Sequence, residues 1–303
     1  MILIITHKED YTVDYIVNIL NERKIDYYRL NCEDVFKSKF LVSNDLLPKI
    51  HGKSNFKSVW FRRTKLPDLS ATPFHERNYL LTEFDSLLKN LFTLIDAKWI
   101  SEPYQIYKAE NKLYQLKLAK EIGLNVPNTI VTNSHKEIKD FYNQNSCQII
   151  VKPLSQSIIH NENNSLEHIF TNLIDKTHIE NLSNFDLTPC IFQQYIEKDF
   201  ELRITVVGEK IFVAGVNSQT DEVAKIDWRK GKLKFYETEI PANIMRMCIK
   251  LVKKLDLKFG AIDIIKDKKG NFVFLEINPN GQWVWIENET GLKISEALID
   301  ELL

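Results

Sequence analysis

The 303-residue sequence has no excess of positive charge. Its 40 Lys and Arg residues are balanced by 41 Asp and Glu residues, so the formal net charge is -1. A protein that binds nucleic acid by neutralising phosphates carries a basic excess or a dense basic run, and this chain has neither. We therefore expect no nucleic-acid partner.

Long apolar runs and paired cysteines are also missing. No apolar stretch approaches the roughly 18 residues of a membrane span, and the first ten residues turn polar too early for a signal peptide. The cysteines are widely spread, with no CxxC pair: Cys32, Cys147, Cys190 and Cys248. This spread favours free thiols in a reducing compartment. The sequence thus predicts a soluble cytoplasmic protein with no membrane partner.

The order of predicted elements indicates an α/β and α+β protein with a mixed architecture. Residues 1–100 alternate strands with helices, which favours a parallel sheet covered by helices. A second long helix is expected over about 104–122, and from residue 201 the pattern is antiparallel, with a hairpin turn at 208–209. We expect three units: an N-terminal α/β domain (1–105), a central α+β lid (106–196) and a C-terminal α+β domain (197–303).

The most informative chemical pattern lies in the last predicted hairpin, over about 260–278. A two-residue turn at 269–270 places Asp263 directly opposite Glu276, with Cβ atoms about 4.5–5.5 Å apart, and Asn278 on the same face. Opposed carboxylates among apolar neighbours repel, and a hard divalent cation removes that penalty. Two carboxylates and an amide are ligands typical of Mg²⁺. The alternative is a hairpin with a solvated polar end, or a one-residue register shift that separates the acids.

Two lysines are placed where they can meet phosphate. Lys152 closes the apolar strand 149–151, and Lys112 lies on the helix that enters the lid. A lysine at such a position can direct a point charge at a phosphate, although either lysine alone can equally be solvated. The hydroxyls and amides of 155–157 could cover phosphates, but the glycines of a Walker loop are absent.

The segment from about 192 to 203, at the end of the predicted lid, combines a strand with charged residues. The strand at 192–197 runs into a polar turn, which can offer backbone hydrogen bonds to adenine and an acid to ribose. Arg203 shares a strand face with Glu201 and can hold a phosphate through two hydrogen bonds, or form a surface ion pair with Glu201 instead. Arg229, which follows Asp227, offers a second guanidinium for a transferring phosphoryl group.

The order of these features along the chain resembles the ATP-grasp superfamily over about residues 112–280: a helix lysine, a strand lysine, the strand and turn QQYIEKDFELR, and then the Asp…Glu-x-Asn hairpin. Three phrases are similar to the graspetide synthetases, the microviridin-type peptide macrocyclases: SVWFRR at 58–63, KIDWR at 225–229 and FLEINPNGQWVWIE at 274–287. The opening of the chain is similar to these enzymes as well, so the resemblance extends over nearly the whole sequence. It implies an ATP-grasp fold with an N-terminal α/β domain, a central lid and a C-terminal antiparallel-sheet domain.

The resemblance also implies roles for individual residues. It implies Mg²⁺ ligands at Asp263, Glu276 and Asn278. It implies nucleotide contacts at Lys112, Lys152, Gln193, Tyr195, Ile196 and Glu197, with Lys112 and Lys152 on phosphates, the 193–196 segment on adenine and Glu197 on ribose. It implies Arg203 and Arg229 at the γ-phosphate and the acyl phosphate, where Lys152 assists catalysis.

The implied reaction uses ATP and Mg²⁺ to activate a carboxylate as an acyl phosphate. The family joins Asp or Glu side chains of a ribosomal precursor peptide to Ser or Thr hydroxyls (ω-ester) or Lys amines (ω-amide), and recognises a leader segment outside the active site. The guanidinium groups available to hold the peptide carboxylate are those of Arg62, Arg63, Arg203 and Arg229. His160 is a weak candidate for a general base. The ring number, the leader sequence and the choice between a monomer and a homodimer stay open.

Two other functions are compatible with the same ATP site. One is an ATP-grasp amide ligase that acts on a small molecule, an amino acid or a protein tail. The other is a nucleotide-binding scaffold without turnover, against which the intact acid pair counts. The segments at 60–63, 227–229 and 282–287 favour the peptide macrocyclase.

Overall fold

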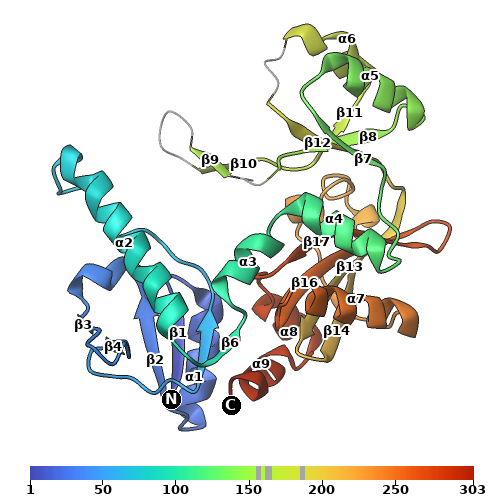
Figure 1. Cartoon of the computed structure of the whole chain (residues 1–303). Helices are drawn as coiled ribbons and strands as arrows, with labels where there is room; N and C mark the ends of the chain where they lie inside the picture. The colour runs from blue at the N-terminus through green and yellow to red at the C-terminus, as the bar shows by residue number, and fades with distance from the viewer. Residues whose placement is uncertain (155–157, 161–165, 185–187) are drawn as a thin grey trace.

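The computed structural model describes residues 1–154, 158–160, 166–184 and 188–303 (Figure 1). The 155–157 segment, with its predicted cover for phosphates, lies outside the described residues. In the described part of the chain, no helix is both long enough and apolar enough to cross a membrane.

The N-terminal unit is built on a parallel sheet, as predicted. Its strands lie in the order β2-β1-β5-β6, all parallel: β1 (Ile2–Thr6), β2 (Tyr27–Asn31), β5 (Ser58–Phe61) and β6 (Lys98–Ile100). Every residue of β1 is buried, as is typical of a parallel strand covered on both faces. The helices are α1 (Tyr11–Glu22) and the long α2 (Phe74–Leu94), and a small hairpin pairs β3 (Phe40–Leu41) with β4 (Lys49–Ile50).

The central unit is a four-stranded antiparallel sheet with its own core. Its order is β11-β8-β12-β7: β7 (Thr129–Thr132), β8 (Ile149–Lys152), β11 (Asn172–Ile174) and β12 (Cys190–Gln194). Helices α5 (His135–Gln144) and α6 (Lys176–Glu180) accompany it, and a hairpin of β9 (Ile158–His160) and β10 (Leu166–His168) projects away (Figure 1). The apolar core includes Ile138, Ile149 and Phe192.

The C-terminal unit carries the five-stranded antiparallel sheet β15-β14-β13-β16-β17. Its strands are β13 (Lys198–Val207), β14 (Lys210–Val216), β15 (Tyr236–Glu237), β16 (Phe259–Asp267) and β17 (Phe272–Asn278). Its helices are α7 (Ala242–Lys254), α8 (Val284–Thr290) and α9 (Ile294–Leu302). The predicted turn at 208–209 is confirmed: Val207 pairs with Lys210, and Gly208 has φ +59°, a value that glycine adopts without strain.

The N-terminal and C-terminal units share their hydrophobic cores. Ile4 of β1 and Leu298 of α9 belong to one buried cluster, and Leu3 of β1 and Ile262 of β16 to another. Ser58 Oγ also donates a hydrogen bond to the backbone carbonyl of Leu302 at 2.6 Å. These two units therefore form one packed body, and the central unit stands over it (Figure 1). The division into domains at 105 and 196 stays a prediction.

The expected helix over 104–122 is wrong in one respect. Two helices occupy this stretch, α3 (Pro103–Ala109) and α4 (Lys112–Glu121). The break lies at Asn111, whose side-chain amide donates to the carbonyls of Tyr107 at 3.1 Å and Lys108 at 3.0 Å. A side chain that satisfies terminal carbonyls competes with helix continuation, and a period of apolar residues does not reveal it.

Candidate active site

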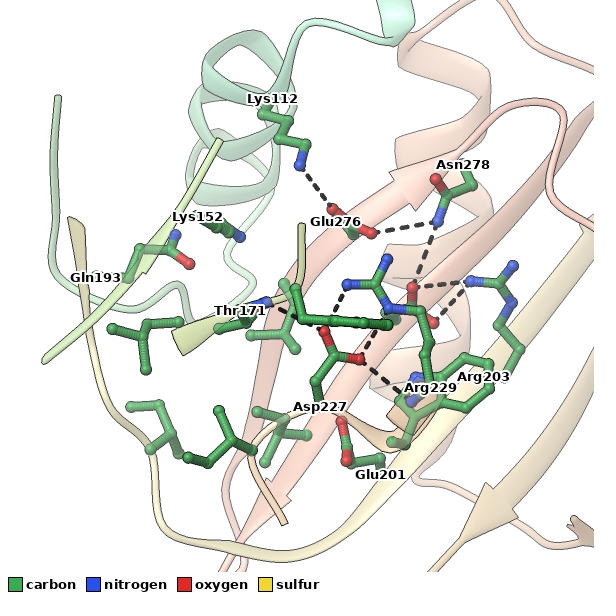
Figure 2. Close-up of a pocket in the computed structure, with 18 of the residues that line it drawn as sticks. Lys112, Lys152, Thr171, Gln193, Glu201, Arg203, Asp227, Arg229, Glu276 and Asn278 are labelled. Atoms are coloured by element: carbon green, nitrogen blue, oxygen red, sulfur yellow. Dashed lines mark hydrogen bonds and ion pairs between the residues drawn. The ribbon is translucent and has the colours of Figure 1, made fainter. Parts of the chain in front are cut away.

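The predicted site residues meet in one cleft between the central sheet and the C-terminal sheet, with a volume of about 640 Å³ (Figure 2). The following predicted residues line it: Lys112, Lys152, Gln193, Tyr195, Ile196, Arg203, Arg229, Asp263, Glu276 and Asn278. Glu197 does not line it; its carboxylate lies 3.5 Å from Lys268 and is 58% exposed. The side chain of His160 lies outside the described part of the structure.

The predicted pairing of Asp263 with Glu276 is confirmed, although the predicted turn is wrong. Asp267 N–H donates to the carbonyl of Asn271 at 2.9 Å, so the turn holds the three residues 268–270. On β17, Leu275 is an extra residue: Ile264 pairs with Phe274, and Asp263 then pairs with Glu276. Such a bulge shifts the register by one residue and restores the opposition of the two acids.

Each of the two carboxylates has its own cation. Arg203 Nη1 donates to both oxygens of Asp263 at 2.8 Å, and Lys112 Nζ lies 3.5 Å from Glu276 (Figure 2). The amide of Asn278 bridges the pair, 3.4 Å from Asp263 Oδ2 and 3.5 Å from Glu276 Oε1. The expected repulsion between the acids is therefore present but reduced, because a protein cation lies beside each carboxylate.

The surroundings push the pKa values of the two acids in opposite directions. Burial raises the pKa of Asp263 to about 6; Arg203 opposes this rise and the charge of Glu276 adds to it. Burial would also raise the pKa of Glu276, but the charges of Lys112, Lys152, Arg229 and Arg203 together outweigh it and hold that pKa below its usual range. Glu276 is therefore the more firmly ionised of the two.

The donor set at this point fits Mg²⁺. Two carboxylates supply hard oxygen ligands, and the side-chain amide of Asn278, which carries a third oxygen, contacts both of them through Nδ2. Among the described residues, no group of three or more His, Cys, Asp or Glu is placed to hold a metal. So small a ligand set leaves coordination positions for phosphate oxygens, which is the usual arrangement of Mg²⁺ at nucleotide sites.

Lys152 lines the cleft from the central sheet. It lies at the end of β8, opposite Ile191 of β12. Burial lowers its pKa to about 8; Glu276 raises this pKa and Lys112 lowers it further. Within the described ranges, no side chain or carbonyl forms an ion pair or hydrogen bond with its ammonium group. A half-buried, unpaired cation that lines a cleft favours an anionic ligand.

The end of β12 and the turn after it hold three of the predicted nucleotide contacts, Gln193, Tyr195 and Ile196. Gln193 is fully buried, and its Nε2 donates to Thr129 Oγ1 at 3.0 Å. The amide of Tyr195 is bonded to the carbonyl of Gln148 at 3.0 Å. The amide of Ile196 has no such bond within the part of the chain that the structure describes. Of the two amides, that of Ile196 is therefore the one left free for a ligand within the described residues.

Asp227 orients Arg229 at the rim of the cleft. Its carboxylate accepts hydrogen bonds from Arg229 Nε at 2.8 Å and Nη2 at 2.5 Å, and from the amide of Thr171 at 3.3 Å (Figure 2). The hydrogen bonds between the two side chains raise the pKa of Arg229 and, despite burial, lower the pKa of Asp227. Trp228 anchors this segment by packing its ring 5.7 Å from that of Trp285.

Lys198 is a site residue that the sequence did not reveal. It is 3% exposed, lines the cleft, and donates to Glu201 at 2.9 Å and to the carbonyl of Ile226 at 3.0 Å. A regular strand would place residues three apart on opposite faces, but a bulge between Lys198 and Phe200 puts them on one face. The expected alternative, a surface pair of Glu201 with Arg203, is wrong, because Glu201 pairs with the buried Lys198 and Arg203 with the partly buried Asp263.

Arg62 and Arg63, two of the candidates for binding a peptide carboxylate, lie in different surroundings. Arg62 is 2% exposed, with Nε 3.4 Å from Asp10 and Nη1 donating to the carbonyl of Asn280 at 3.2 Å. Arg63 Nη2 donates to the same carbonyl at 3.3 Å and lines the cleft. Arg62 therefore holds the turn after Asn278, and of these two candidates Arg63 is the one that lines the cleft.

Comparisons with known proteins agree with this geometry. A macrocyclase MdnC of Microcystis aeruginosa, bound with precursor peptide MdnA, is 27% identical, with a TM-score of 0.87 and coverage of 100% of this chain and 99% of that one. A RiPP-associated ATP-grasp ligase of Chryseobacterium gregarium, in complex with ADP and a leader and core peptide, is 28% identical, with a TM-score of 0.89 and coverage of 99% and 96%.

A curated relative of a different kind matches as well. The α-aminoadipate–LysW ligase LysX of Sulfurisphaera tokodaii is 22% identical over 71% of this chain and 75% of its own. The family model described as a RimK-like ATP-grasp domain matches residues 109–302, which include the acid pair, the cations paired with it and the turn after β12. The expected ATP-grasp fold is thereby confirmed, and the chain is an ATP-grasp ligase of the RimK-like family.

Proposed function

We propose that this ligase phosphorylates Asp or Glu side chains of a ribosomal precursor peptide and joins them to Thr or Ser hydroxyls of the same peptide. The product is an ω-ester macrocycle. The observation that carries this proposal is the similarity, over 96% or more of both chains, to two ligases solved with precursor, leader or core peptides. The similarity includes residues 1–108, which precede the family match and contribute Arg63 to the cleft.

The charges of the cleft suit the chemistry. A carboxylate is a poor acyl donor, so one of its oxygens first attacks the γ-phosphorus of ATP and ADP leaves. The acceptor hydroxyl then attacks the acyl carbon with loss of its proton, and inorganic phosphate leaves. Both steps depend on positioning and on neutralised charge. The cations that line the cleft supply that neutralisation without a glycine-rich loop.

We assign the roles accordingly. Lys112 and Lys152 would contact the nucleotide phosphates, and Arg203 and Arg229 the transferring phosphoryl group. Gln193, Tyr195 and Ile196 would contact adenine, with Glu197 at the ribose. Asp263, Glu276 and Asn278 would hold Mg²⁺, which when bound neutralises phosphate charge.

A second candidate is an amide ligase that acts on a small molecule, an amino acid or a protein tail. The similarity to the α-aminoadipate–LysW ligase supports it. That match covers less of the chain than the matches to the peptide ligases, so we place it second.

Glu276→Gln should abolish ADP release while the fold survives. Because the cations hold the pKa of Glu276 below its unfolded value of about 4.3, the ionised acid contributes stability above that pH. The variant should therefore be slightly less stable than the parent at pH 7, and the difference should shrink as the pH falls below about 4. Glu121→Gln, in an exposed pair with Lys254, is the matched control. Parental ATP consumption by Glu276→Gln would refute the assignment.

Nucleotide affinity should depend on the charge of Lys152. Its pKa of about 8 means that ADP binding above that pH requires proton uptake, so the affinity should be flat below pH 8 and fall above it. Lys152→Arg, which stays charged, should lack this fall. Lys152→Ala should weaken binding about 10- to 100-fold. Calorimetry from pH 7 to about 9.5 measures all three; identical profiles for the parent and Lys152→Arg would exclude this role.

The product distinguishes the two candidate functions. With a candidate precursor rich in Thr and in Glu or Asp, we expect ATP-dependent loss of one water per bond by mass spectrometry. Mild alkali should then reopen the rings, because it hydrolyses esters and leaves amides intact. Products that resist alkali, or turnover only with a free amino acid, would favour the second candidate.

A further inference from the structure

The strand that carries Glu276 and Asn278 lies at the edge of its sheet, next to α4 (Figure 1). An edge strand leaves backbone N–H and C=O groups without a neighbouring strand. At Ile277, between the two proposed ligands, one side chain takes the place of that strand. Gln115 Oε1 accepts the Ile277 N–H at 3.0 Å, and Gln115 Nε2 donates to the Ile277 carbonyl at 2.8 Å.

The same amide also ties two helices together. Gln115 Nε2 donates a second hydrogen bond to the carbonyl of Ala109, the last residue of α3, at 2.7 Å. Gln115 itself belongs to α4, is 2% exposed and does not line the cleft. One buried side chain therefore connects α3, α4 and β17, and both of its donor hydrogens are used.

Lys112 depends on this connection. It is the first residue of α4 and precedes Gln115 by three positions, so the two side chains lie on one side of the helix. Lys112 Nζ lies 3.5 Å from Glu276 and 3.5 Å from the carbonyl of Pro153. With Gln115 fixed to Ile277, Lys112 is held beside the neighbouring residue, Glu276.

We propose that Gln115 is a positioning residue for the Mg²⁺ and phosphate site. It touches no substrate. It fixes the backbone between Glu276 and Asn278, and with it the spacing of these two ligands and the distance from Lys112 to Glu276. The inference rests on the proposed function, because it takes Glu276 and Asn278 as Mg²⁺ ligands. Removing groups that orient metal ligands typically costs about 10- to 100-fold in metal affinity or activity.

The test is Gln115→Met, which keeps the volume and removes all three hydrogen bonds. We expect the Mg²⁺ concentration that half-saturates ADP binding to rise about 10-fold or more, and kcat to fall about 10- to 100-fold. The KM for the peptide should stay within about twofold, because the peptide does not contact this residue. Calorimetric titration of ADP at a series of Mg²⁺ concentrations gives the first quantity without turnover.

Asn125→Ala is the matched control. Asn125 Nδ2 also bonds the outer edge of β17, at the carbonyl of Phe272 at 3.3 Å, but four residues before Glu276. Its loss should leave the Mg²⁺ requirement unchanged. If Gln115→Met does not fold, Gln115→Asn, whose amide is one methylene shorter and cannot span the same bonds, should give the same shift.

Two outcomes would overturn the inference. A lower thermal midpoint in the Gln115 variants, with a Mg²⁺ requirement within about twofold of the parent, would mean that Gln115 only stabilises the fold. If the parent itself binds ADP without any dependence on Mg²⁺, the proposed metal site fails, and this inference fails with it. The behaviour of the parent therefore distinguishes the two failures.

Discussion

The opposition of Asp263 and Glu276 on neighbouring strands is the constraint on which the site depends. Two acids this close within a cleft are tolerated because Arg203 and Lys112 each neutralise one of them. The cleft carries more cations than acids, although the whole chain has a net charge of -1. The positive excess is thus local, and it lies where the phosphates of a nucleotide would bring negative charge.

The architecture gathers these charges from separately packed parts of the chain. Lys152 and Gln193 belong to the central sheet, which has its own core. The acids and Arg203 belong to the C-terminal sheet, which shares its cores with the N-terminal unit. Arg62 and Arg63 extend this sharing to the site, because both hold the carbonyl of Asn280, two residues beyond Asn278. The N-terminal unit therefore supports the site as well as lining it.

Much of this arrangement could be predicted from sequence, and the failures have a common cause. The alternation of polar and apolar residues and the turn residues located the strands. The predicted pairing of Asp263 with Glu276 was right because two register errors of one residue cancelled: the turn is one residue longer than predicted, and the bulge at Leu275 adds one residue to β17. A second bulge hid Lys198 as the partner of Glu201. The break between α3 and α4 depends on the hydrogen bond that the Asn111 side-chain amide donates to a helix carbonyl. The burial of Arg62 depends on its ion pair with Asp10. Neither bulges nor hydrogen bonds and ion pairs of single side chains change the spacing of apolar residues in a sequence, so this spacing does not predict them.

The central claim is that the cleft activates a peptide carboxylate by phosphorylation, and trapping the intermediate tests it most directly. Hydroxylamine converts an acyl phosphate to a hydroxamate before the ring can close. With ATP, Mg²⁺ and precursor, we expect a hydroxamate on an Asp or Glu side chain of the peptide, formed together with ADP. Release of AMP and pyrophosphate, or a hydroxamate formed only from a free amino acid, would contradict the account.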